Sequence, residues 1–315
     1  MGEQFTCCIC GTKNGRAEGL QFAAVRSNVR RFSRQQFALW RCASCRSIHA
    51  RDQIDLGPYY EHYPFKRQRM SWMLRRVYGV LLGRLRRAGL RKSSSILDYG
   101  CGSGLLVEFL RSKGYARAAG YDAYSEQFAD PGVLAEQYDC LMGQDVIEHV
   151  EEPLASLRTF AGLVRPGGTI VIGTPNAEAI DLARPERFVH SLHQPYHRHV
   201  WSKQALLKAA GDLGWRLQRF YTTAYTNTHV PLMNTRFLLR YLRSSDNTVD
   251  AAFEPLKGNA LKLLKPAVFF DAFFGSFFDP RTEMFAVFRT RAAEYAASPT
   301  QQGPQDSPPE ERRQA

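Results

Sequence analysis

Short apolar runs alternate with amphipathic stretches from Ser95 to about residue 290. The apolar runs predict buried strands at 96–99, 118–122, 138–143, 169–173, 215–222 and 283–290. Between them, apolar residues recur at three- and four-residue steps and predict helices at 105–113, 153–164 and 202–214. This alternation is typical of a doubly wound α/β fold, in which helices cover both faces of a mostly parallel sheet. We expect the domain to span 93–295, with a turn at 165–168, which reads Arg-Pro-Gly-Gly.

Three further segments flank or interrupt this domain. Residues 66–92, within a linker at 51–92, predict a basic amphipathic helix because arginines separate the apolar positions. An insert at about 223–282 holds three Phe-Phe pairs, at 269–270, 273–274 and 277–278. They are spaced as one helical stripe, which would lie in the core, cover a substrate as a lid, or rest on a membrane surface. The tail 296–315 is rich in Pro, Gln, Ser and Glu, and we expect it to be disordered.

Positive charge is concentrated in the N-terminal third. Residues 1–92 hold 19 Lys and Arg against 5 Asp and Glu, whereas the whole chain of 315 residues has a net charge of +12. A basic face of this kind suits nucleic acid, anionic lipid or an acidic substrate. The sequence shows no secretory signal pattern and no uncharged apolar run of about 20 residues that would predict a transmembrane helix. We expect a cytoplasmic protein, and the phenylalanine stripe leaves membrane association open.

A glycine-rich loop follows the first strand of the α/β domain. Residues 97–104 read LDYGCGSG, and Asp122 stands 18 residues after the last of these, at the end of the second predicted strand. Glycines permit positive φ and let a ligand approach the backbone, and a carboxylate at the second strand suits a ribose diol. The spacing Gly-x-Gly-x-Gly, with Leu105 where a third glycine would stand, departs from the dinucleotide-binding pattern. Asp98 would repel a pyrophosphate but hold an ammonium group, which favours a cationic amino-acid nucleoside.

Three stretches in order carry a resemblance to a known family: ILDYGCGSG at 96–104, QDVIEHV at 144–150 followed by Glu152-Pro153, and LVRPGGTIVIGTPN at 163–176. Together they resemble the class I S-adenosylmethionine-dependent methyltransferases, in particular the branch with ubiquinone-biosynthesis-type O-methyltransferases. The resemblance implies a Rossmann-like sheet that binds S-adenosylmethionine. It also implies a set of cofactor-binding residues: Asp98, Gly100, Gly102 and Gly104 at the methionine and ribose, Asp122 at the ribose hydroxyls, and Gln144 with Asp145 beside the sulfonium.

One departure from the family concerns the third strand. Many relatives have a separate strand there that supplies an acidic residue near the adenine. Only 15 residues separate Asp122 from Tyr138 in this chain. We therefore expect that strand to be shortened or missing.

Histidines supply the candidates for catalysis. His149 follows the fourth strand, and four more histidines fall within ten residues at 190–199, after the last strong parallel strand. Ligands bind at the carboxyl edge of such sheets, and histidine is the natural general base near neutral pH. We take His149, His193 and His197 as candidate bases. The alternatives are a metal site, surface histidines without a role, and, for Asp145 and the glutamates beside His149, a structural part in the first turn of a helix.

The N-terminal residues 1–50 contain two Cys-x-x-Cys pairs, Cys7 with Cys10 and Cys42 with Cys45. In a reducing compartment such pairs are more often metal ligands than disulfides, and four thiolates complete a tetrahedral structural zinc site. Residues 22–29 and 31–40 would form a hairpin between the pairs, and the extra Cys8 leaves the register of the first pair ambiguous. The segment resembles the zinc ribbons found ahead of some methyltransferase domains. We expect a small zinc-ribbon-like module.

Three functions stay open at this stage. The first is an S-adenosylmethionine-dependent methyltransferase that acts on a small-molecule, glycan or lipid-linked acceptor, at oxygen. The second is a zinc-containing RNA methyltransferase that uses the basic N-terminal third for phosphate contact, although the aromatic residues do not form an evident stacking platform. The third is a non-catalytic cofactor-binding or interaction protein, in which loss of the glycine loop would be expected. The sequence does not reveal the oligomeric state.

Overall fold

A computed structural model of the chain describes residues 4–14, 20–52, 54–254 and 265–292. Its central sheet has six strands in the order β11-β12-β9-β8-β6-β7. Four of these strands are parallel: β6 (Ile96–Tyr99), β7 (Ala118–Tyr121), β8 (Tyr138–Gln144) and β9 (Val164–Pro175). β12 (Glu283–Arg289) lies antiparallel between β9 and β11 (Arg216–Tyr221). The doubly wound α/β fold is confirmed; the tail 296–315 falls outside the described residues.

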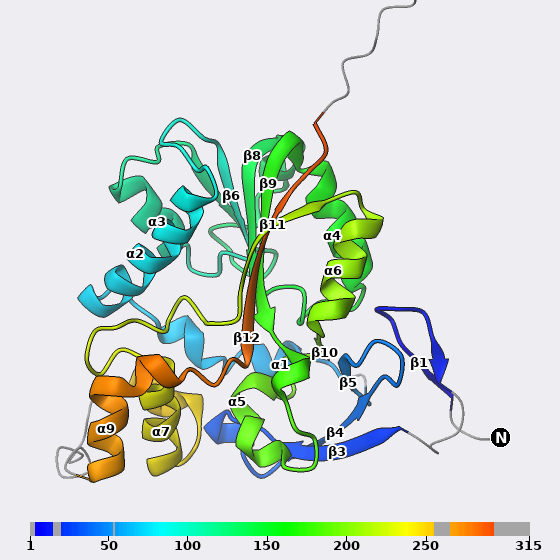
Figure 1. Cartoon of the computed structure of the whole chain (residues 1–315), viewed down its shortest axis with the longest axis vertical. Helices are drawn as coiled ribbons and strands as arrows, with labels where there is room; N and C mark the ends of the chain where they lie inside the picture. The colour runs from blue at the N-terminus through cyan, green and yellow to red at the C-terminus, as the bar shows by residue number, and fades with distance from the viewer. Residues whose placement is uncertain (1–3, 15–19, 53, 255–264, 293–315) are drawn as a thin grey trace, which may run out of the picture.

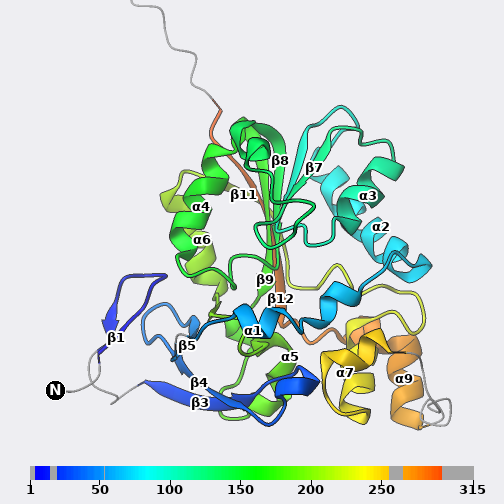
Figure 2. The same cartoon turned by 180° about the vertical axis from the view of Figure 1, so that it is seen from behind.

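Helices cover both faces of this sheet (Figures 1 and 2). α2 (Trp72–Arg87) and α3 (Leu105–Ser112) lie on one face, and α4 (Pro153–Gly162) and α6 (Lys203–Asp212) lie on the other. Each face has its own buried core. One core includes Leu81 and Phe109, and the other includes Phe160 and Leu206. α3, α4 and α6 therefore form where the apolar periodicity predicts them.

Two local predictions need correction. The helix predicted over 66–92 is shorter: Pro64–Arg67 forms a separate 3-10 helix, and the Ser71 hydroxyl caps α2 by accepting a hydrogen bond from the Leu74 N–H. Residues 165–168 are not a separate turn but belong to β9. They bulge there, since Tyr138 pairs with Val164 whereas Cys140 pairs with Thr169, which leaves extra residues on β9.

The N-terminal residues form two small sheets. β1 (Phe5–Thr6) and β2 (Lys13–Asn14) pair near the cysteines. A second, antiparallel sheet has the strands β3 (Gln21–Arg26), β4 (Gln36–Arg41), β5 (Ile48–Ala50) and β10 (His199–Val200). The predicted hairpin is present with shorter strands, because Arg30–Phe32 forms a 3-10 helix between them. β10 comes from the α/β domain, so one sheet joins the two parts of the chain.

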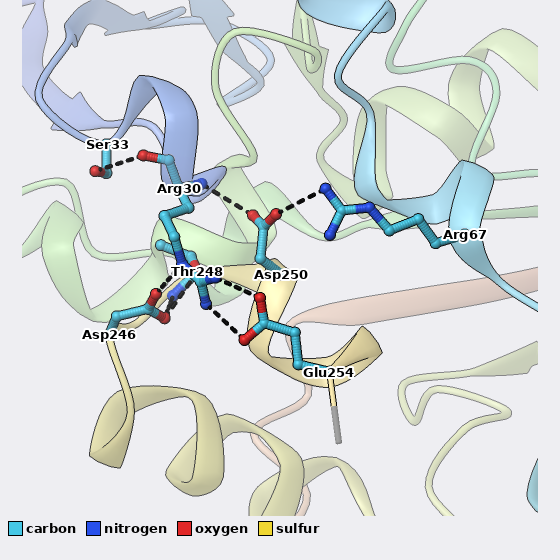
Figure 3. A network of polar contacts seen from close by, with 7 residues as sticks. All are labelled: Arg30, Ser33, Arg67, Asp246, Thr248, Asp250 and Glu254. Atoms are coloured by element: carbon cyan, nitrogen blue, oxygen red, sulfur yellow. Dashed lines mark hydrogen bonds and ion pairs between the residues drawn. The ribbon is translucent and has the colours of Figure 1, made fainter. Parts of the chain in front are cut away.

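The insert also contacts the N-terminal part. It contains α7 (Thr235–Ser244), a 3-10 helix at Val249–Phe253 and α9 (Pro266–Phe274). Figure 3 shows the contact: the Arg30 guanidinium pairs with Asp246 and Glu254, and the Arg30 N–H donates to Asp250 at 2.9 Å. Arg67 of the linker reaches the same Asp250 carboxylate at 3.6 Å. Three segments far apart in sequence are thus connected through five charged side chains and one backbone N–H.

The phenylalanine stripe is not core. Its six side chains, on α9 and the 3-10 helix Gly275–Phe278, are exposed: Phe269, Phe270, Phe273, Phe274, Phe277 and Phe278. Their exposed fractions run from 43% to 70%, which is unusual for so many large apolar side chains on neighbouring turns. Of the three interpretations, burial in the core is therefore wrong.

The expected loss of the third strand is confirmed. The fully described stretch from Asp122 to Tyr138 contains a 3-10 helix, Pro131–Ala135, and no strand. β7 is therefore the edge of the sheet. Two short α-helices, α1 (Gly57–Tyr60) and α5 (Val189–Leu192), lie toward the N-terminal sheet, near the end of the central sheet where the parallel strands finish (Figure 1). Among the described residues, no helix combines the length and apolar character needed to span a bilayer.

Candidate active site

The loop after β6 is tightly folded. Gly100, Gly102 and Gly104 all have positive φ, at +79°, +55° and +74°. A Cβ on Gly100 would approach the Val146 side chain to 2.4 Å, and a Cβ on Gly104 would approach the Phe128 ring to 2.2 Å. A Cβ on Gly102 would meet nothing within 4 Å. Two of the glycines are thus needed for packing, and the third borders open space that a ligand can enter.

Two carboxyl groups flank this loop. Asp122, which follows β7, accepts hydrogen bonds from the Gly102 N–H at 2.8 Å and from the Tyr124 N–H at 2.9 Å. Asp98 on β6 is 4% exposed; its burial, with the nearby Asp122 charge, raises the pKa of its carboxyl to about 7. A cationic ligand would offset the free-energy cost of burying a charged carboxylate and so favour the ionised form of Asp98. The loop therefore favours a ligand that carries positive charge.

The end of β8 adds further acidic groups. Asp145 has φ +53°, and its Oδ1 accepts a hydrogen bond from the Gln144 amide at 3.0 Å. Burial raises the pKa of Asp145 to about 6. Glu148 is fully buried: Thr174 donates to its Oε2 at 3.0 Å, and its Oε1 has no hydrogen-bond partner among the described residues. Burial, and then repulsion from Asp145, raises the pKa of Glu148 well above its usual range. Such a group of carboxyls is best compensated by a cation.

The three predicted catalytic histidines lie together. The ring centroids of His149 and His197 are 4.8 Å apart, and those of His193 and His197 are 5.0 Å apart. His197 Nδ1 donates to the Ser191 carbonyl at 3.0 Å, which fixes the orientation of its ring. Burial lowers the pKa of His149 to about 4 and, together with the neighbouring histidines, lowers the pKa of His193 and His197 well below the ordinary value. All three rings are therefore neutral at pH 7.

Sequence reasoning missed two tyrosines of this cluster. The Tyr60 hydroxyl lies 3.1 Å from His149 Nδ1, and its ring stacks on Tyr124 with centroids 5.5 Å apart. Tyr63 packs against Tyr196 with centroids 4.7 Å apart. Because Tyr124 is two residues from Asp122, this contact joins the histidines to the glycine loop. The aromatic run at 59–63 was the available signal, but the sequence indicates only a connector there.

A hollow elsewhere on the molecule does not compete with this site. It is lined by Trp215, Arg289 and Arg291 among others, beside the start of the parallel strands. The registers show the separation: Arg289 pairs with Thr169 at one end of β9, and Glu283 pairs with Pro175 at the other. The glycine loop and the histidines lie at the second end, so the hollow is distant from the acidic groups.

The four predicted zinc ligands converge. The Sγ atoms of Cys7, Cys10, Cys42 and Cys45 all lie within 4.8 Å of one another, with 3.6 Å between Cys7 and Cys45 and 3.7 Å between Cys10 and Cys42. Four sulfurs around a zinc ion at about 2.3 Å are about 3.8 Å apart, so these spacings fit. Cys8 lies outside this set. Two other groups have spacing suited to a metal: Glu148, His149 and His197, and Cys8, His49 and His199.

The comparisons with known proteins agree with this geometry. Residues 73–251, more than half of the chain, match the family model described as a methyltransferase domain. The chain belongs to this methyltransferase family. With its glycine loop and sheet order it is a class I S-adenosylmethionine-dependent methyltransferase and therefore an enzyme. The interpretation as a non-catalytic protein is not supported.

Curated relatives match only part of the methyltransferase. A ubiquinone biosynthesis O-methyltransferase from Parvibaculum lavamentivorans is 29% identical over 158 residues, which are 41% of this chain and 61% of the relative. The one from Aeromonas salmonicida is 34% identical over 103 residues, 26% of this chain and 43% of the relative. The chain thus spans less than two thirds of the length of these relatives.

Two solved structures are similar at low identity. The complex between the Haloferax volcanii Trm112 methyltransferase activator and a putative methyltransferase has a TM-score of 0.45 at 14% identity, and the match covers 70% of this chain and 92% of that one. A putative sarcosine dimethylglycine methyltransferase from Galdieria sulphuraria has a TM-score of 0.43 at 16% identity, with 69% and 86% covered.

Proposed function

We propose that this enzyme transfers the methyl group of S-adenosylmethionine to a hydroxyl oxygen of a small amphiphilic acceptor, such as a lipid-linked molecule. In this proposal Gly100, Gly102 and Gly104 receive the backbone of the donor, and Asp122 exchanges its bond to the Gly102 N–H for the ribose hydroxyls. The observation that carries it is the open space at Gly102, directly beside the Asp122 carboxylate, which accepts a hydrogen bond from the Gly102 N–H. The carboxylates of Asp98 and Asp145 compensate the ammonium and sulfonium charges of S-adenosylmethionine, and the Gln144 amide holds the Asp145 carboxylate through its hydrogen bond.

His149 is the residue that we assign to the acceptor hydroxyl. In the tautomer whose Nδ1–H donates to the Tyr60 oxygen, Nε2 keeps its lone pair and can take the proton as the oxygen attacks the methyl carbon. A pKa of about 4 keeps this ring neutral at physiological pH. The His197 ring packs edge-on against the His149 ring, and the His193 ring stacks on Tyr196. We therefore assign His193 and His197 to positioning.

A divalent cation is the second way to activate the oxygen. Glu148, His149 and His197 each offer one ligand atom within 4.8 Å of the others, and Glu148 Oε1 has no hydrogen-bond partner among the described residues. A cation there would lower the pKa of a bound hydroxyl. Restoration of activity by Mg²⁺ or Mn²⁺ after chelation would favour the cation, and activity unaffected by chelation would favour the histidine alone.

The exposed phenylalanines support an amphiphilic acceptor. An apolar surface on α9 and the following 3-10 helix, with the Arg236 guanidinium 5.3 Å from the Phe278 ring, has the composition of a segment that lies on an anionic membrane. We infer that this surface brings the enzyme to acceptors in the bilayer. Replacing Phe269 and Phe277 with serine should lower the affinity for phosphatidylglycerol vesicles, measured by sedimentation, about tenfold or more. The control Leu217→Ser, at an exposed site on β11, should sediment as the wild type does, and equal binding of all three would contradict the assignment.

RNA is the less favoured acceptor, because part of the basic charge is used inside the protein. The buried Arg41 guanidinium donates to the carbonyls of Ala177 and Ile180, and Arg84 donates to the Thr223 carbonyl. Arg30 is committed to acidic partners. A steep fall of RNA affinity with salt would revive the RNA alternative.

The cysteine cluster is proposed as a structural zinc site, since four thiolates leave no open position on the ion. Three of its ligands, Cys7, Cys42 and Cys45, share a hydrophobic core with Trp201 and Leu206 of the α/β domain. The zinc would therefore fix the fold of residues 1–50 against the methyltransferase domain rather than take part in the transfer.

Calorimetric titration with S-adenosylhomocysteine tests the donor site. Asp122→Ala should weaken binding at least tenfold, because the ribose loses its carboxylate partner. Asp130→Ala is the matched control: this carboxylate accepts the N–H two residues on, from Gly132 at 2.8 Å, but lies outside the glycine loop. Equal affinity of both variants and the wild type would contradict the site. Methyl-release assays on quinol, glycan and RNA pools then identify the acceptor.

A further inference from the structure

Three metal-ligating side chains that the function above does not use meet beside the four-cysteine cluster. Cys8 follows β1, His49 lies on β5 and His199 lies on β10, so the three come from distant parts of the chain. The two histidines are direct partners in the strand register. His49 Nδ1 and His199 Nδ1 are 3.4 Å apart, and Cys8 Sγ lies 3.5 Å from His199 Nδ1 and 3.7 Å from His49 Nδ1.

The outer nitrogens of both imidazoles already have partners. His199 Nε2 lies 2.9 Å from the Val150 carbonyl, which can only accept, so Nε2 carries the proton and Nδ1 carries the lone pair. His49 Nε2 lies 3.2 Å from Cys7 Sγ, and a zinc-bound thiolate there accepts the Nε2 proton. His49 Nδ1 then carries a lone pair as well. Two lone pairs that face each other at 3.4 Å repel unless a cation lies between them.

We propose that Cys8, His49 and His199 bind a second zinc ion, distinct from the ion of the four cysteines. In a tetrahedral site with Zn–N of about 2.0–2.1 Å and Zn–S of about 2.3 Å, two nitrogens are about 3.3 Å apart and nitrogen and sulfur are about 3.6 Å apart. The three observed distances match these edges. Outer nitrogens that donate to a carbonyl and to a thiolate are also the usual support for histidine ligands.

The two ions would be connected through one ring. His49 donates from Nε2 to Cys7, a ligand of the first ion, and offers Nδ1 to the second. Both histidines are buried, whereas Cys8 is exposed, so the fourth position of the second ion opens to solvent and takes a water. Because His199 belongs to the α/β domain, this ion would fasten the N-terminal sheet to it. The protonation argument for His49 rests on the zinc proposed at the four cysteines.

Zinc content per chain tests the proposal on the full-length protein, loaded with Zn²⁺, desalted and measured by mass spectrometry. The wild type should hold two ions, and Cys8→Ser and His199→Gln should each hold one. Cys140→Ala is the control and should hold two, since it removes a buried cysteine on β8 that belongs to the other hydrophobic core. If His199→Gln does not fold, Cys8→Ser decides the matter, because its side chain is exposed.

Cobalt titration provides an independent readout. The second equivalent of Co²⁺ should add weak charge-transfer absorption, as expected from one thiolate, and Cys8→Ser should lack that step. If the wild type and Cys8→Ser bind the same number of ions, the proposal is wrong and a shared proton joins the two imidazoles. If the four-cysteine assignment alone fails, Cys10→Ser matches the wild type while Cys8→Ser still loses one ion.

Discussion

Gly102→Ala separates backbone strain from ligand approach more cleanly than other substitutions in the loop. Alanine at φ +55° costs about 1 kcal/mol or slightly more, because its Cβ crowds the following carbonyl in the left-handed region. No atom lies within 4 Å of the added methyl group, so packing contributes nothing further. We expect the melting temperature to fall by about 2–4 °C. If the donor approaches the backbone here, the methyl group should weaken S-adenosylhomocysteine binding at least tenfold, or about 1.4 kcal/mol.

Gly114→Ala is the control for this experiment. Gly114 has φ +86° just after α3, and the nearest atom to its added Cβ is the flexible Lys92 amine at 3.5 Å. It should lose similar stability and retain wild-type affinity. Both variants are measured by thermal melting and by calorimetric titration. Wild-type affinity in Gly102→Ala, or equal weakening in Gly114→Ala, would refute the reasoning that the space beside Gly102 is reserved for the donor.

Four further outcomes are expected. Gly104→Ala should lower both the melting temperature and the affinity, because its Cβ would enter the Phe128 ring; an unchanged melting curve would contradict this packing. His149→Gln should lower kcat about 10²–10⁴-fold while S-adenosylhomocysteine affinity stays the same, with His190→Gln as the buried control that retains turnover. Burial holds the pKa of His149 and His190 at about 4, below the unfolded value of about 6.5. Between these two pH values the unfolded chain binds more protons than the folded one, so these rings should make the free energy of unfolding fall as the pH drops from about 6.5 to 4. Melting curves across that range check the sign, and His149→Gln should flatten them. Arg30→Ala should cost about 1–2 kcal/mol and speed proteolysis at 246–254; cleavage at the wild-type rate would show that the ion pairs contribute little.

Local sequence features predicted most of the fold. Each strand of the central sheet coincides with a short apolar run, and the glycine loop lies between a strand and a helix as expected. Such features are encoded within a few neighbouring residues, so periodicity and turn chemistry can identify them. The bulge at 165–168 escaped prediction because it depends on the register with β8, which no local pattern contains.

The site was less predictable because residues far apart in the sequence come together there. Tyr60 reaches His149 across 89 positions, and Cys8 reaches His199 across 191. The histidine run was correctly associated with the carboxyl edge, but only the fold shows that His149 contacts His197 while His199 turns toward Cys8. The phenylalanine stripe has a helical period whether it faces core or solvent, and so its exposure had to come from the structure.

The place of β12 in the sheet limits how this enzyme can be shortened. The family match ends at residue 251, yet β12 lies between β9 and β11, and its register covers Glu283–Arg289. A fragment cut at the family boundary would retain β11 without the strand that it pairs with. It would also leave the backbone of β9 without a partner strand on one side from Thr169 to Pro175. Anyone seeking a minimal catalytic fragment should therefore keep the chain to at least residue 292.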